Sequence, residues 1–389
     1  MRLIPSVLCC LAVLAVTACA SGGVTENETF PAPEPRFADY IEKVHAHIAA
    51  QSLFGRGPDA VALNLPFELA ASPAVAYRGK FLLFHGLNDS AYVWTDMAQV
   101  IAAQGFDVRS VLLPGHGSHP DAMLEISYTS WIKAARAHLA LWDVDDTPMY
   151  LGGFSLGGVL ATALALDNPD IAGVLLISPA YKSRLNHLLR WSWLYNHYET
   201  YVFGGIILED NPIKYNSIPI NSGTQYYNAT RYLANRWGDK RLRMPVMMVV
   251  TDVDSVVDVD HSRGLFHARF VHPDSRLLIY SNDPDIDPRD GEIVRGSHQP
   301  DRRILNQSHL SLLNAPDNPL FGEAGRVLVC NGNEYPIFMA CMRARGHWFG
   351  AQHTPSPDGV PVARTTYNPD FPYLLTLFEQ VFTVAGRME

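Results

Sequence analysis

A serine between two glycines is the feature of this 389-residue chain that is best suited to chemistry. The residues Gly153-Phe154-Ser155-Leu156-Gly157 follow an apolar run, 148–151, and precede an Ala- and Leu-rich run, 158–166. This pattern predicts a strand, a tight turn and a helix. A serine on such a turn has a strained backbone, and its hydroxyl stands above the sheet. We therefore predict that Ser155 is a nucleophile, and that Gly153 and Gly157 let the strand and the helix approach closely.

A serine hydroxyl is a weak nucleophile, so it needs a base, and the base needs an orienting acid. In enzymes with this pentapeptide the chain order is serine, acid, histidine. The acid is expected in the turn that follows a late strand, which the sequence predicts over 244–250. Asp254 fits best and Asp252 is the alternative, while Asp258 is expected to cap a helix that begins near His261.

The base is expected further along the chain, which contains fifteen histidines. His309 directly follows a short strand predicted over 303–306, whereas the acidic, proline-containing segment 281–301 is expected to be an exposed excursion. We therefore predict His309 as the base. His298 is the alternative. It would be the base if the strand predicted over 276–280 were the last strand before the histidine.

Backbone N–H groups must stabilise the negative oxygen that forms when the serine attacks a carbonyl. One donor should be the N–H of Leu156, at the start of the helix after the nucleophile. The other should come from the loop after the strand predicted over 79–84, where His85-Gly86-Leu87 allows a close approach. We predict the N–H of Leu87.

Strands and helices alternate from about residue 78, and the strands are unbroken apolar runs. This pattern predicts an α/β fold with a mostly parallel sheet that helices cover on both faces. The alternation stops over about 180–240, an aromatic-rich insertion that we expect to form a cap over the nucleophile. Its aromatic residues would either line an apolar pocket or pack the cap onto the core. The segment 310–362 is loop-rich, and 371–384 predicts a closing helix.

The first eighteen residues are expected to be a signal peptide. Their apolar run is shorter than the roughly twenty residues that span a bilayer. The end of that run resembles the bacterial lipobox, which implies lipidation of Cys19, a tether over 19–37 and a globular domain over 38–389. The alternative is an ordinary signal peptide cleaved near Ala18 or Ala20. No aspartate follows Cys19, and by resemblance to enterobacterial sorting this implies an anchor in the outer membrane.

Two cysteines remain once the signal peptide and the lipidated Cys19 are set aside. Cys330 and Cys341 would lie in an oxidising compartment, so we expect a disulfide between them, with two buried thiols as the alternative. The formal net charge of −9 and the lack of a basic patch argue against nucleic acid as a partner. No cofactor or metal is implied.

Several motifs together resemble the α/β-hydrolase superfamily. They are His85-Gly86-Leu87-Asn88-Asp89-Ser90, Leu113-Pro114-Gly115-His116-Gly117, the serine pentapeptide and Asp254. The resemblance covers about 78–257 and is greatest to monoacylglycerol lipases, bacterial carboxylesterases and serine-aminopeptidase-like hydrolases. It implies an eight-stranded sheet with a cap, a triad of Ser155, Asp254 and His309, and an oxyanion hole of Leu87 and Leu156. The chain departs from the family in the long intervals before and after His309.

The sequence thus predicts a lipid-anchored bacterial serine hydrolase. It would cleave small carboxylic esters of apolar acyl groups through an acyl-enzyme. A peptidase or amidase with the same triad is the enzymatic alternative. A catalytically inactive hydrolase fold that serves as an interaction module is the alternative from another class of protein.

Overall fold

The computed structural model describes residues 30–51, 57, 59–330 and 335–382. Its centre is an eight-stranded sheet in the order β1-β3-β2-β4-β5-β6-β7-β8, in which β1 is antiparallel to β3 and the other pairs are parallel. The strands are β1 (Phe67–Leu69), β2 (Gly79–Phe84), β3 (Phe106–Val111), β4 (Met149–Phe154), β5 (Gly173–Ile177), β6 (Val246–Thr251), β7 (Arg276–Tyr280) and β8 (Glu292–Arg295).

The middle of the sheet is buried on both faces. Every residue of β2, β5 and β6 is buried, which explains why these strands appear in the sequence as unbroken apolar runs. The predicted fold class, a mostly parallel sheet covered by helices, is confirmed.

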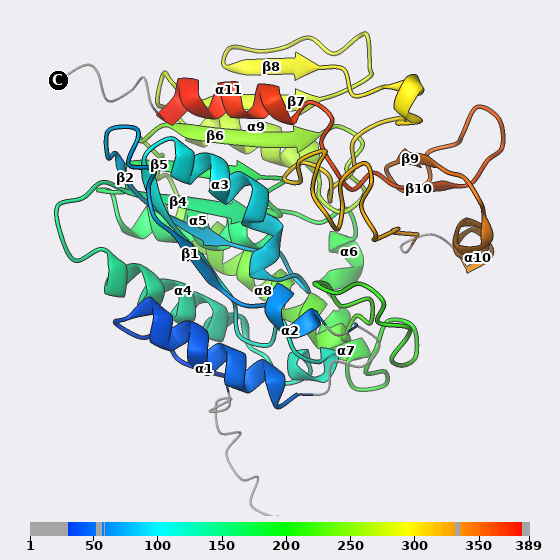
Figure 1. Cartoon of the computed structure of the whole chain (residues 1–389), viewed down its shortest axis with the longest axis horizontal. Helices are drawn as coiled ribbons and strands as arrows, with labels where there is room; N and C mark the ends of the chain where they lie inside the picture. The colour runs from blue at the N-terminus through cyan, green and yellow to red at the C-terminus, as the bar shows by residue number, and fades with distance from the viewer. Residues whose placement is uncertain (1–29, 52–56, 58, 331–334, 383–389) are drawn as a thin grey trace, which may run out of the picture.

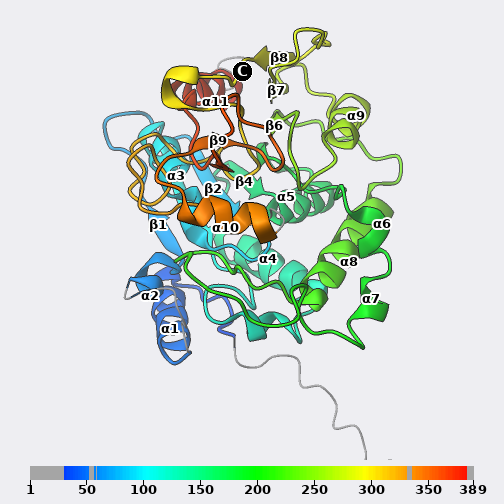
Figure 2. The same cartoon turned by 90° about the vertical axis from the view of Figure 1, so that its right-hand side faces the viewer.

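Helices form a layer on each face of the sheet (Figures 1 and 2). One apolar core joins the sheet to α3 and α11, and the other joins it to α1, α4, α5, α8 and α9. The long helices are α1 (Phe37–Ala49), α3 (Thr95–Ala103), α4 (Tyr128–Trp142), α5 (Leu156–Asp167), α8 (Ile220–Trp237), α9 (Val259–Arg269) and α11 (Phe371–Phe382). The short ones are α2 (Ala60–Leu63), η1 (Ala91–Trp94), η2 (Pro120–Met123) and η3 (Pro300–Arg302).

The insertion between β5 and β6 carries α6 (Asn186–Leu189), α7 (Ser192–Tyr195) and α8, and α8 packs on α5. The sequence left two roles open for its aromatic residues. Tyr181, Tyr226 and Trp237 are buried in the core, in agreement with packing onto it, whereas Tyr201 is buried outside the core. Five others fit neither role, because they are 48–86% exposed: Trp191, Trp193, Tyr195, Tyr198 and Phe203.

The prediction for 281–306 is wrong in where it puts the strand, although residues 282–290 are mostly exposed, as expected. The segment 281–301 contains strand β8, which pairs with β7, whereas 303–306 forms no strand. Arg303 has a left-handed backbone (φ 56°) as the C-cap of η3, so the predicted strand cannot begin there, and Ile304 makes only isolated bridges. β8 escaped prediction because it is a half-buried edge strand whose Glu292 is neutralised by Arg263, 2.6 Å away.

A long excursion, residues 310–364, separates β8 from α11. It contains α10 (Tyr335–Arg343) and a small parallel pair, β9 (Trp348–Gly350) and β10 (Val362–Arg364). Cys330 and Cys341 form a disulfide within it. Figure 1 shows β9, β10 and α10 beyond the carboxyl-terminal end of the sheet, which is where the residues after β4 and β6 also lie.

The predicted signal peptide, Cys19 and most of the predicted tether lie outside the described residues. Within the described part of the chain, none of the helices is both long enough and apolar enough to cross a bilayer.

Candidate active site

Ser155 lies on a sharp turn between β4 and α5. Its backbone has φ 53° and ψ −115°, a strained combination for a residue with a side chain. A Cβ on Gly153 would lie 2.3 Å from the carbonyl oxygen of Gly157, and one on Gly157 would lie 2.0 Å from that of Phe84. Neither position can carry a side chain. The turn therefore has the geometry that holds a serine hydroxyl above a sheet.

His309 and Asp254 form a buried hydrogen-bonded pair. The Nδ1 of His309 donates to Oδ2 of Asp254 across 2.7 Å, and Oδ1 of Asp254 accepts from the N–H groups of Val256 (2.8 Å) and Val257 (3.0 Å). Burial alone would raise the pKa of Asp254, but His309 and the two N–H groups outweigh burial and lower it. The ionised carboxylate thus holds the imidazole through Nδ1, which leaves Nε2 as the nitrogen that can accept a proton.

The pair lies close to the nucleophile turn. The ring of His309 is 5.1 Å, centroid to centroid, from the ring of Phe154, which directly precedes Ser155. In the part of the chain that the structure describes, no hydrogen bond joins Ser155 to His309. Such a bond is often long in a free enzyme and shortens when substrate binds.

The loop after β2 approaches Ser155 from the other side. A Cβ on Gly86 would lie 3.2 Å from Cβ of Ser155. Burial lowers the pKa of His85 to about 3, so its ring is neutral. Leu113 donates its N–H to Nε2 of His85 (3.0 Å), which assigns the proton to Nδ1, and Nδ1 donates to the Gly86 carbonyl oxygen (2.8 Å). This bond orients the peptide between Gly86 and Leu87, whose N–H is the predicted oxyanion donor.

The alternatives to Asp254 and His309 take no part in this buried pair. His298 is exposed, and its Nδ1 is 3.3 Å from the carbonyl oxygen of Leu305. Asp258 accepts from the N–H of His261 (3.0 Å) at the start of α9, which is the capping role that the sequence predicts. Asp252 accepts a hydrogen bond from Ser281, and the Oδ1 of Asp252 is buried without a partner.

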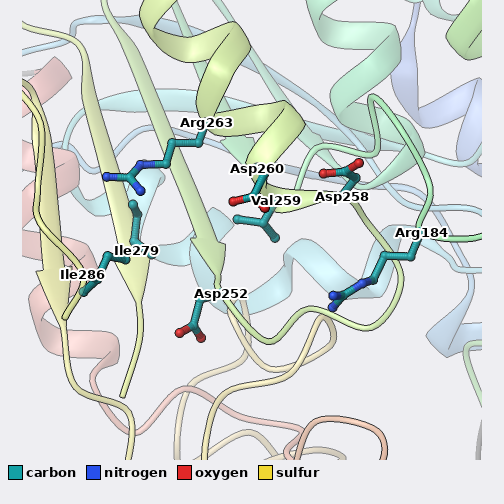
Figure 3. Close-up of a pocket in the computed structure, with 8 residues that line it drawn as sticks. All are labelled: Arg184, Asp252, Asp258, Val259, Asp260, Arg263, Ile279 and Ile286. Carbon is teal, nitrogen blue, oxygen red and sulfur yellow. The ribbon is translucent and has the colours of Figure 1, made fainter. Parts of the chain in front are cut away.

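Asp252 lines a cavity of about 320 Å³ that is separate from His309. Figure 3 shows the eight residues around it: Arg184, Asp252, Asp258, Val259, Asp260, Arg263, Ile279 and Ile286. None of them is a serine or a histidine. This cavity is the larger of the two that we describe, yet its lining residues provide no nucleophile with a neighbouring base.

The cavity beside His309 is smaller, about 140 Å³. This is less than the roughly 300–1,000 Å³ that is usual for small-molecule sites, so the cavity would hold a short group. Its walls come from the cap, the acid loop, the base loop and the C-terminal excursion: Asn211, Lys214, Tyr215, Val256, Ser308, His309, Leu310, Val329 and Arg364. The sequence analysis missed Lys214 and Arg364, because neither lies in a motif or at a spacing that indicates a site.

Comparison with known proteins shows what part of the chain is similar to. The family described as "Serine aminopeptidase, S33" matches residues 76–202. A thermostable monoacylglycerol lipase from Bacillus sp. (strain H-257) is 28% identical over 117 residues, which are 30% of this chain and 47% of the relative. The chain therefore spans about half the length of that curated relative.

Two solved structures are also similar. One was described in a study of LipS and LipT, two metagenome-derived lipolytic enzymes, and has a TM-score of 0.48 with 18% identity over 56% of this chain and 91% of that chain. The other is a monoacylglycerol lipase of Paleococcus ferrophilus, with a TM-score of 0.44 and 18% identity over 56% and 88%. The family match, taken with the strand order and the serine turn described above, shows that the chain has the α/β-hydrolase fold.

Proposed function

We propose that this protein is a serine hydrolase that cleaves carboxylic esters through an acyl-enzyme. The observation that carries the proposal is the buried 2.7 Å hydrogen bond between His309 and Asp254, close to the strained turn of Ser155. A hydroxyl, an imidazole with a free Nε2 and an ionised carboxylate are the groups that nucleophilic acyl transfer requires.

The reaction would begin when Oγ of Ser155 attacks the ester carbonyl carbon and Nε2 of His309 takes the hydroxyl proton. Asp254 would stabilise the imidazolium, and the N–H groups of Leu87 and Leu156 would stabilise the oxyanion. As the intermediate collapses, the C–O bond breaks and His309 gives its proton to the leaving alcohol. A water molecule would then release the acid from Ser155 by the same steps.

The curated relative favours esters, because it is named a monoacylglycerol lipase. The cavity of about 140 Å³ beside His309 limits the group bound there to a short one, so we propose an ester with a short acyl group or a small alcohol. The matched family name refers to an aminopeptidase, and a site for a free amine would need a carboxylate to hold the ammonium group. Among the described residues that line the His309 cavity there is no carboxylate, and Lys214 and Arg364 are cations. This lining favours an esterase over an aminopeptidase.

We also propose that the enzyme works at a lipid surface, anchored through a lipid on Cys19, in the outer membrane. The exposed apolar residues of the cap support this proposal. Of the nineteen large apolar side chains that are exposed among the described residues, eleven lie within 185–208: Leu185, Leu188, Trp191, Trp193, Leu194, Tyr195, Tyr198, Val202, Phe203, Ile206 and Leu208. Tryptophan and tyrosine prefer surfaces where one end of the ring is apolar and the other is wet.

Labelling with a fluorophosphonate probe tests the function directly. The wild-type protein should be labelled and should hydrolyse p-nitrophenyl butyrate, and Ser155→Ala should do neither while it unfolds at an unchanged temperature. Loss of the nucleophile in comparable triads costs on the order of 10⁶ in rate. A folded Ser155→Ala variant that keeps more than a few per cent of the activity would refute the assignment.

A further inference from the structure

Two positive side chains line the cavity beside the proposed base. Lys214 comes from the cap and Arg364 from the end of β10, so segments 150 residues apart bring like charges to one small space. The formal charge of the chain is −9, and yet no aspartate or glutamate is among the described residues that line this cavity. Such a lining calls for a physical explanation.

Arg364 is held rigidly. Its Nη1 donates to Oγ of Ser255 (2.9 Å), its Nη2 donates to Oε1 of Gln352 (2.8 Å), and the residue is only 8% exposed. Burial lowers the pKa of Arg364 to about 10, so the guanidinium keeps its charge at neutral pH. Asp254 acts on this guanidinium in the opposite sense to burial, and an anion bound in the cavity would add to the interactions that Arg364 already has.

Lys214 is oriented by a carboxylate that lies behind the cavity wall. Its Nζ forms an ion pair with Asp89, whose side chain is completely buried, while the side chain of Lys214 is 20% exposed. Its Nζ also lies 5.6 Å from the ring centroid of Phe154, next to the proposed nucleophile. The negative partner is thus beneath the surface, and Lys214 itself lines the cavity.

The carboxylate of Asp254 is arranged in the same way. It is completely buried, and its oxygens accept from His309, Val256 and Val257. Asp89 and Asp254 are therefore buried within the protein, while both cations line the space. Lys214 and Arg364 line the cavity, whereas Asp89 and Asp254 are not among its lining residues.

We propose that Lys214 and Arg364 form an anion-binding subsite of the active site, so that the preferred ester carries a carboxylate or phosphate group close to the bond that is cleaved. The inference rests on the ester hydrolysis proposed above and names its substrate class. A guanidinium presents paired N–H donors that match a carboxylate or a phosphate, and an ammonium adds a point charge. Both residues lie beyond residue 202, outside the part of the chain that the family match covers.

Two pairs of esters test the subsite. Mono-p-nitrophenyl succinate and p-nitrophenyl butyrate differ by a carboxylate on the acyl side. Butyrylglycerol 3-phosphate and monobutyrylglycerol differ by a phosphate on the alcohol side. We expect the wild-type protein to prefer the charged member of at least one pair by about tenfold or more in kcat/KM. Arg364→Gln should remove most of that preference, chiefly by raising KM for the charged ester.

Arg184→Gln is the matched control. Arg184 donates from Nη1 to the backbone carbonyl of Asp254 (2.7 Å), but it lines the other cavity. Its loss should disturb the acid loop and slow both members of a pair alike, so the preference should persist. Arg364→Lys keeps the charge without the paired donors and should fall between the wild type and Arg364→Gln. It also serves as the test if Arg364→Gln does not fold.

Three outcomes would overturn the subsite: no preference for a charged ester in the wild type, an undiminished preference in the Arg364 variants, or equal loss of preference in Arg184→Gln. If the fluorophosphonate probe does not label Ser155 and no ester is cleaved, it is the proposed function that fails. Calorimetric titration with succinate and with glycerol 3-phosphate then decides the subsite by itself. Binding that Arg364→Gln or Arg364→Lys weakens at least tenfold would support it, and no binding to the wild type would overturn it.

Discussion

The hydroxyl of Ser308 donates a hydrogen bond to the backbone carbonyl of Thr365 across 2.6 Å. This bond joins the residue before His309 to the residue after Arg364. The side chain of Thr365 adds a second link, because its Oγ1 donates to the carbonyl oxygen of Asn306 (2.7 Å). The loop that carries the proposed base is therefore held by the end of the C-terminal excursion and not by a strand that enters the sheet.

Thr365→Val removes the hydroxyl that donates to the carbonyl oxygen of Asn306, so this buried carbonyl loses that hydrogen bond. Such a loss typically costs about 1–3 kcal/mol. We expect the variant to lose stability in urea and also to lose ester hydrolysis at a temperature where it is fully folded, because the base loop loosens.

Thr366→Val is the matched control for that experiment. The Oγ1 of Thr366 makes an equivalent buried bond to the carbonyl oxygen of Phe321 (2.7 Å), away from the base loop. It should lose similar stability while kcat is retained. Equal losses of kcat in the two folded variants would contradict the claim that Thr365 positions the base.

This arrangement explains which parts of the site could be predicted. The turn around Ser155 is local, since strand, glycines and helix are contiguous in the sequence, and the structure forms it as expected. Asp254 follows a buried strand directly, so its position could also be inferred. The structure brings His309 to Asp254, but the reason given from sequence, a strand over 303–306, was wrong.

The residues that the sequence analysis missed are those that only long-range packing places. Arg364 reaches the site through β10, a three-residue strand that pairs with β9 in a small sheet of their own. Lys214 is fixed by Asp89, which is 125 positions away in the chain. No periodicity or local motif encodes either contact, and so no single-sequence pattern could reveal a cationic cavity wall.

His309→Ala should remove ester hydrolysis almost as completely as Ser155→Ala does, because members of a triad act as a unit. His298→Ala should keep most of the activity, since His298 is exposed and its hydrogen-bond partners are Asn282 and Leu305, not Asp254. The measurement is kcat/KM for p-nitrophenyl butyrate with each variant. The reverse result would transfer the role of base to His298.

Cys19→Ala should move the protein from the membrane fraction to the soluble fraction of cells, because the proposed lipid would no longer be attached. Fractionation before and after a high-salt wash measures this. The double variant Cys19→Ala, Trp193→Ser should bind lipid vesicles more weakly than Cys19→Ala alone, since Trp193 is 51% exposed on the cap. Unchanged retention of Cys19→Ala in washed membranes would refute the lipid anchor.

Acid should destabilise the fold through His138, which is buried against the rings of Tyr40 (4.7 Å) and Phe37 (6.2 Å). Burial, and then the charge of Arg109, lower the pKa of His138 to about 3 from an ordinary value near 6.5. Between these two pKa values, the unfolded chain therefore binds a proton at His138 that the folded chain does not. The contribution of His138 to the free energy of unfolding is complete above pH 6.5 and is lost as the pH falls toward 3. The slope is about 1.4 kcal/mol per pH unit.

His138→Leu keeps the apolar contacts and removes the titrating group. Between pH 6.5 and 4 its free energy of unfolding, measured by urea denaturation, should fall less steeply than that of the wild type by about that slope. Other buried histidines, such as His85 and His116, would still make both proteins sensitive to acid, because burial lowers the pKa of each to about 3. If the two proteins lost stability in parallel over this range, the folded protein would not hold His138 in its neutral form.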